Sequence, residues 1–98
     1  MHPYTMLKEM LRDMGAELTT EDLRPDVFGS YVAMYAHGGR PIRLVWDGKD
    51  GWGGVQQYCS GEEWSNATDF LTEGDLEGVP PNLAKIDRFK QVVATLLR

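Results

Sequence analysis

Residues 43–52 read Arg-Leu-Val-Trp-Asp-Gly-Lys-Asp-Gly-Trp, with two tryptophans on either side of a short run of Asp, Gly and Lys. Asp-Gly steps between β-prone runs favour a hairpin, because glycine adopts positive φ at little cost and aspartate can accept hydrogen bonds from its own backbone. The stretch therefore predicts a strand that ends near Asp47, a tight loop, and a strand that starts near Trp52.

A second hairpin is predicted immediately upstream. The run from Gly29 to Ala36 is rich in β-prone residues, and Gly38-Gly39 fits a two-residue turn. Such a turn sets the register, so that Tyr35 pairs with Ile42, Ala33 with Leu44 and Tyr31 with Trp46. We expect these six residues to face the core, since they include the larger aromatics and no charge. The opposite face would carry Ser30, Val32, Met34, Arg43, Val45 and Asp47.

The third strand, residues 52–59, has two possible registers, which differ in the face that each side chain takes. If Asp47 pairs with Trp52, the core face receives Val55, Gln57 and Cys59 and the other face receives Trp52, Gln56 and Tyr58. If Trp46 pairs with Trp52, the two sets exchange places. We favour the first register, because a lone cysteine is usually buried and a four-residue loop is a common hairpin connection. Gly53 and Gly54 indicate a bulge or a close approach.

Apolar residues at helical spacing predict a helix at each end of the chain. The first runs from Tyr4 to Met14 and ends at Gly15, and the second is capped by Asn82 and runs to Leu97. Between them, residues 19–22 resemble a capping box and predict a short helical turn. Residues 60–81 predict an ordered, acid-rich loop, with a brief strand at 63–65 and a helical turn at 68–72.

Together these elements predict a single α+β domain over residues 1–98. Its parts are an N-terminal helix, a three- to four-stranded antiparallel meander and a C-terminal helix, with both helices packed on one sheet face. Unless the 60–81 segment folds over it, the other sheet face would be open. An open apolar patch of this kind marks a partner or dimer interface. The expected patch contains Val32, Met34, Val45, Trp52 and Tyr58.

Charge is unevenly distributed along the 98-residue chain, which has a net charge of −5. Residues 44–84 carry eight acids and a single base, Lys49. A surface of this sign attracts a basic partner and repels nucleic acid. No apolar run is long enough to cross a bilayer, the start of the chain lacks the features of a signal peptide, and a lone Cys59 fits a reducing compartment. We therefore expect a cytoplasmic location and no membrane partner.

The sequence predicts no catalytic residue, metal site or cofactor. His2 and His37 lack a second ligand at metal spacing, and no motif pairs Cys59 with a base. Residues 47–51 lack the alternating oxygen ligands and closing glutamate of a calcium loop, and residues 51–54 lack the Lys-Ser/Thr of a phosphate loop. A binding role is therefore favoured over an enzymatic one.

The run Leu-Val-Trp-Asp-Gly-Lys-Asp-Gly-Trp, within residues 30–58, resembles strand-turn-strand segments of small cytoplasmic bacterial proteins, including immunity proteins that neutralise polymorphic toxins. This resemblance implies a non-enzymatic role in which the protein binds a toxic enzyme tightly, stoichiometrically and by charge complementarity. No functional residue is carried over from the family.

Aromatic anchors and surrounding acids are the residue types suited to occluding a basic active site. The predicted contact set is Asp47, Asp50, Trp52, Tyr58, Glu62, Glu63 and Trp64. Two alternatives stay open. The protein could be a phage or host inhibitor that mimics phosphate to block a nucleic-acid-binding machine, or a homodimeric module that binds a small molecule between its tryptophans.

Overall fold

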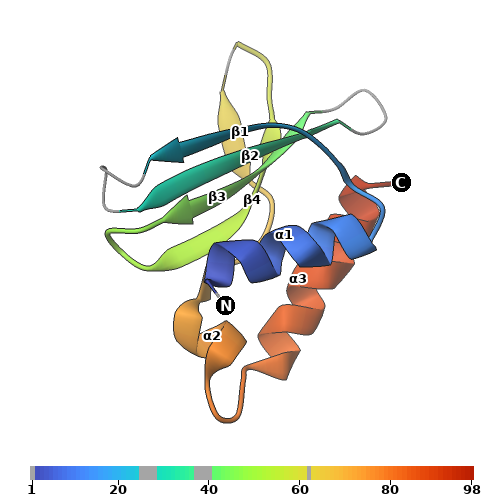
Figure 1. Ribbon diagram of the computed structural model, residues 1–98. Coiled ribbons are helices and arrows are strands. Elements are labelled where there is room, and N and C mark those ends of the chain that lie inside the picture. The colour runs from blue at the N-terminus through green and yellow to red at the C-terminus, as the bar shows by residue number, and fades with distance from the viewer. Residues whose placement is uncertain (1, 25–28, 37–40, 62) are drawn as a thin grey trace.

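The computed structural model describes residues 2–24, 29–36, 41–61 and 63–98, and it confirms the α+β architecture (Figure 1). Helix α1 (Pro3–Asp13) precedes an antiparallel meander in the sequence, and helix α3 (Leu83–Leu96) follows it. The sheet follows the order β1 (Glu17–Arg24), β2 (Ser30–Ala36), β3 (Ile42–Asp47), β4 (Trp52–Tyr58) and β5 (Trp64–Asn66). Strand β6 (Leu71–Thr72) also pairs with β4. The predicted Gly38-Gly39 turn lies outside the described residues.

The two predicted hairpin registers are confirmed. Tyr35 pairs with Ile42 and Tyr31 with Trp46 between β2 and β3, and Asp47 pairs with Trp52 between β3 and β4. Because side chains alternate along a strand, this register decides which residues enter the core and which face outward.

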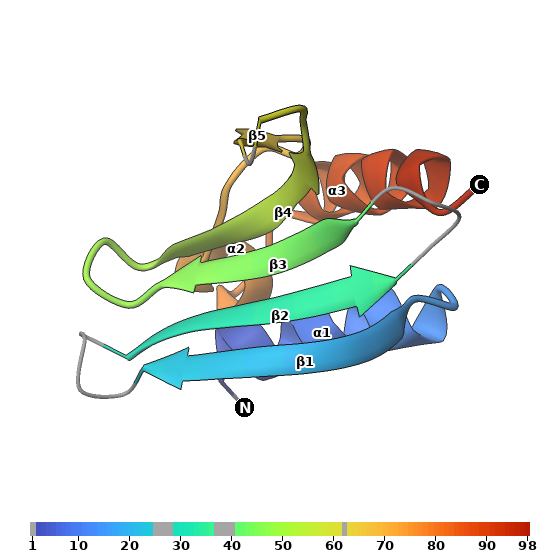
Figure 2. The same ribbon diagram turned by 90° about the horizontal axis from the view of Figure 1, so that it is seen from above.

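Both long helices cover the same sheet face, as predicted. In Figure 1 they lie below the sheet, and Figure 2 shows the opposite face with no helix over it. The core between the two layers includes Leu7 from α1, Leu44 from β3 and Phe89 from α3, each at most 1% exposed. None of the described helices is long and apolar enough to cross a membrane.

The predicted helical turn at residues 19–22 is wrong, because these residues belong to β1, an additional strand at the sheet edge. This strand pairs antiparallel with β2, and its register shifts between Leu18 and Thr20. A capping box is a local signal, whereas pairing along β2 satisfies the backbone of the whole segment. The β-branched side chains of Thr19 and Thr20 also suit a strand.

The segment after β4 is partly as predicted. The brief strand is confirmed as β5, displaced by one residue, but the helical turn predicted at 68–72 is wrong. The backbone N–H of Ala67 donates to the Val55 carbonyl (2.9 Å), and the N–H of Val55 donates to the Thr68 hydroxyl (2.9 Å). These bonds hold the chain extended along β4. Helix α2 (Glu73–Glu77) begins only after Thr72, whose side chain caps it.

The prediction that Cys59 is buried is also wrong, because its side chain is exposed. Strand β4 ends at Tyr58, so the alternation of faces no longer applies at the next residue. The N–H of Cys59 instead donates to the carbonyl of Glu63 (2.7 Å), which closes the turn toward β5.

Candidate functional site

Three of the seven predicted contact residues lie on the sheet face that no helix covers, where residues 68–70 lie against Gly54. Trp52 and Tyr58 are the first and last residues of β4. Their side chains take the same face of the sheet as Val45, which pairs with Gly54. Trp64 of β5 is paired with Tyr58 and therefore lies on the same face. Figure 2 looks onto this side of the sheet. The register of the hairpins, rather than any local motif, places the three rings on one face, with Trp52 at one end of β4 and Tyr58 and Trp64 at the other.

Ring contacts join these residues into two pairs. Trp52 stacks on Phe70 with 4.0 Å between ring centroids, and Tyr58 meets Trp64 edge to face at 5.5 Å. Phe70 and Tyr58 are 38% and 37% exposed. We call this set, Trp52, Tyr58, Trp64 and Phe70, the aromatic face. Large rings with a half-exposed surface are the side chains that dominate binding energy at protein interfaces.

Acidic side chains stand at both ends of the aromatic face. At the Trp52 end, Asp47 caps the β3–β4 turn, since its Oδ1 accepts the N–H groups of Lys49 (2.9 Å) and Asp50 (3.1 Å). Asp50 is exposed in that turn, and Glu63 is exposed beside Trp64 at the other end. The seven residues of β4 separate the two ends by about 20 Å. The remaining predicted contact residue, Glu62, lies outside the described residues.

Arg43 belongs to the same face, and the sequence reasoning assigned it no role. Its guanidinium lies over the Trp64 ring, 4.3 Å from the centroid, and its Nε–H donates to Gln56 Oε1 (2.8 Å). The Gln56 amide in turn donates to Asn66 Oδ1 (2.9 Å). Burial lowers the pKa of Arg43. Only the alternation of β3 indicated that Arg43 faces outward; its partners come from two other strands.

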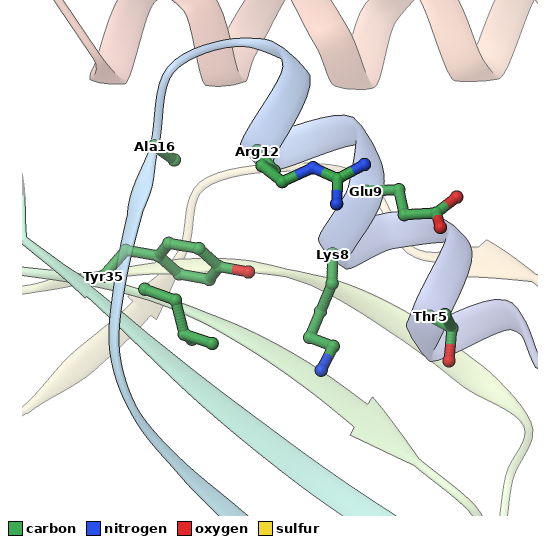
Figure 3. Close-up of a pocket in the computed structure, with 7 residues that line it drawn as sticks. Thr5, Lys8, Glu9, Arg12, Ala16 and Tyr35 are labelled. Carbon is green, nitrogen blue, oxygen red and sulfur yellow. The ribbon is translucent and has the colours of Figure 1, made fainter.

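A hollow of about 300 Å³ lies on the helix side of the molecule, between α1 and β1. Figure 3 shows Lys8 and Arg12 projecting from the helix toward it and Tyr35 from the sheet. A second hollow of about 320 Å³ shares Thr5 and Lys8 with the first. Neither hollow is lined by a tryptophan, so neither corresponds to the pocket expected for a small-molecule module.

Lys8, which lines both hollows, is neutralised by Glu21 of β1. Lys8 Nζ binds both carboxylate oxygens of Glu21 at 3.0 and 2.9 Å, and Glu21 also accepts the Tyr4 hydroxyl at 2.7 Å. The hydrogen bond from Lys8, with that from Tyr4, lowers the pKa of Glu21. Burial and the bond to Glu21 raise the pKa of Tyr4, which keeps its hydroxyl as a donor. This cluster ties α1 to the edge strand.

The lowered pKa of Glu21 predicts an acid-sensitive contribution to stability. The folded state binds its proton less tightly than the unfolded state, so the contribution is present above pH about 4 and is lost as the pH falls through the lower folded pKa. Glu21→Gln is expected to cost about 1 kcal/mol at pH 7 and almost nothing near pH 2. Urea denaturation at both pH values measures this. Glu17→Gln on the same strand is the control, and an equal cost of Glu21→Gln at both pH values would contradict the assignment.

Within the described ranges, no group of three His, Cys, Asp or Glu side chains is arranged to hold a metal ion. Comparison with protein-family models, curated proteins and solved structures found no match to this chain. The geometry of the open face therefore carries the functional inference.

Proposed function

We propose that this protein is a non-enzymatic binding protein that occludes a basic site on a partner protein, as an immunity protein blocks a nuclease-like toxin. The observation that supports this most is that two aromatic pairs, Trp52 with Phe70 and Tyr58 with Trp64, lie at the two ends of β4 on one face that no helix covers. Acids at both ends of that face give it the charge that a basic site requires.

The two kinds of residue have different tasks in this proposal. The rings of the aromatic face lose water on binding and supply most of the affinity, which is the usual role of central aromatic anchors. Asp50 and Glu63 are exposed at the perimeter, where charge mainly raises the rate of encounter. The partner is thus expected to present a recess for the rings within a basic rim.

The test is to mix the purified protein with the product of the gene adjacent to its own. We expect a stoichiometric complex by size-exclusion chromatography with light scattering, and loss of any enzymatic activity of that product. Failure to form a complex would contradict the proposed partner. A complex with a nucleic-acid-binding machine instead would favour the inhibitor alternative, and a tryptophan fluorescence change on adding a small molecule alone would favour the small-molecule module.

Charge reversal at the perimeter tests the steering role of the acids. Asp50→Lys and Glu63→Lys are each expected to slow association about 3- to 10-fold at low salt, because each replaces attraction by repulsion. The effect should shrink above about 0.5 M salt, where the screening length is only a few ångströms. Stopped-flow fluorescence measures the rate. Asp87→Lys makes the same change on the exposed side of α3 and is the control; an equal effect there would show that only net charge matters.

A further inference from the structure

Arg43 is a half-buried cation on the open face, where its guanidinium lies over the Trp64 ring and bonds to Gln56. The ion pairs given by the described residues do not include it. Its one hydrogen bond, from Nε to the neutral amide of Gln56, leaves the charge without a counterion in that part of the chain. This distinguishes Arg43 from Lys8 and Lys85, which each bind a carboxylate of this protein.

The remaining donors of Arg43 are accessible. A guanidinium has five N–H groups, and only the one on Nε is bonded to a described residue. No buried side-chain nitrogen or oxygen in the described ranges lacks a hydrogen-bond partner. No described residue accepts a hydrogen bond from the two Nη nitrogens, and Arg43 is only half-buried, so a ligand on the open face can reach them.

The guanidinium is also held in place before any ligand binds. Its plane packs on Trp64, and the Gln56–Asn66 amide contact fixes the residue that accepts its Nε–H. A planar donor group that is already oriented loses less conformational freedom when it binds an anion in bidentate fashion.

A partner that covers the open face must supply an anion to the Arg43 guanidinium. A partner that buries the aromatic face would remove the water that now solvates the Nη nitrogens, and a buried unpaired guanidinium is strongly unfavourable. The partner must therefore bring an acceptor with negative charge to Arg43. A phosphate dianion would be repelled by the exposed Glu63 beside Trp64 more strongly than a monoanionic carboxylate, whose charge would be neutralised by the basic residues around it.

We propose that Arg43 is an anion subsite that binds one carboxylate side chain of the partner, at the centre of an otherwise basic surface. This inference rests on the proposed function, because it assumes that the open face binds a basic protein. It adds that the partner's site contains an aspartate or glutamate opposite Arg43, Trp64 and Gln56.

Three blocked peptides test the subsite by NMR titration of the labelled protein. The first has a glutamate between two pairs of lysines, the second has glutamine in place of that glutamate, and the third has the glutamate between glycines. We expect the first to bind about 3- to 10-fold more tightly than the second and to shift the Arg43 Nε–H and Trp64 indole resonances. Arg43→Gln should remove this difference, while Arg12→Gln, an exposed arginine of α1, should retain it.

The outcomes separate the subsite from the proposed function. Equal binding of the two lysine peptides would overturn the subsite and leave the basic partner supported. If the third peptide shifted the Arg43 resonance and bound as tightly as the first, the subsite would be supported and the basic partner contradicted. No response to any peptide would overturn both. Inorganic phosphate that shifted Arg43 at lower concentration than the first peptide would overturn the assignment to a carboxylate.

Discussion

Replacing Gly53 with alanine is expected to lower the free energy of unfolding by about 3 kcal/mol. A Cβ atom at this position would lie 2.6 Å from Trp46 Cε3, 3.0 Å from Leu7 Cδ1 and 3.0 Å from the Val45 carbonyl oxygen. Leu7 is completely buried and Trp46 is 4% exposed, so neither can move without disturbing the core. The added methyl group must instead separate β4 from β3 or from α1.

Urea denaturation of the variant measures this loss. Gly74→Ala is the matched control, since its Cβ would meet nothing closer than 3.8 Å and its position in α2 favours alanine over glycine. That variant should be as stable as the parent or more stable by up to about 1 kcal/mol. If Gly53→Ala were as stable as Gly74→Ala, the close packing of α1 on β3 and β4 would be contradicted.

Replacing Trp64 with alanine is expected to weaken binding to the partner at least 30-fold, which corresponds to about 2 kcal/mol. Trp64 contacts both Tyr58 and the Arg43 guanidinium, so its removal takes away a ring and also frees the cation beside it. The free energy of unfolding should fall by only about 1 kcal/mol, because Trp64 lies outside the core.

Isothermal titration with the protein that forms the complex measures the change in Kd, and circular dichroism checks the fold. Val79→Ser is the control, since Val79 is a fully exposed apolar residue in the loop between α2 and α3. We expect its Kd to equal that of the parent. A parent-like Kd for Trp64→Ala would show that the partner uses a surface other than the aromatic face.

Much of the central sheet could be predicted because its signals are local. The Asp-Gly loop predicted the β3–β4 hairpin with two possible registers, and the structure has the favoured one, in which Asp47 pairs with Trp52. The cap at Asn82 similarly predicted the start of α3, where its side chain accepts the N–H of Lys85. In these cases, residues close in the chain determine each other's conformation.

The errors occur where partners distant in the chain compete with a local signal. Thr19 and Thr20 resemble a helix start, but β2 offers them a strand to pair with. Residues 68–72 also suit a helical turn until Thr68 bonds to the backbone of Val55. Cys59 is exposed although a lone cysteine is usually buried, because β4 ends at Tyr58 and the alternation of faces stops there.

The candidate site shows the same difference between local signals and partners distant in the chain. Alternation along β4 placed Trp52 and Tyr58 outward, so part of the aromatic face was predictable. Phe70 and the partners of Arg43 were not, because no short-range pattern relates Phe70 to Trp52 or Arg43 to Trp64.

The sequence by itself determined the β2–β3 register, the two long helices and the concentration of acids in the middle of the chain. These follow from backbone preferences, periodicity and composition, which act over a few residues. Only the tertiary structure decided that β1 is a strand, that Phe70 stacks on Trp52, and that Arg43 stands without a counterion among the described residues. Packing and desolvation depend on groups that meet only after the chain has folded.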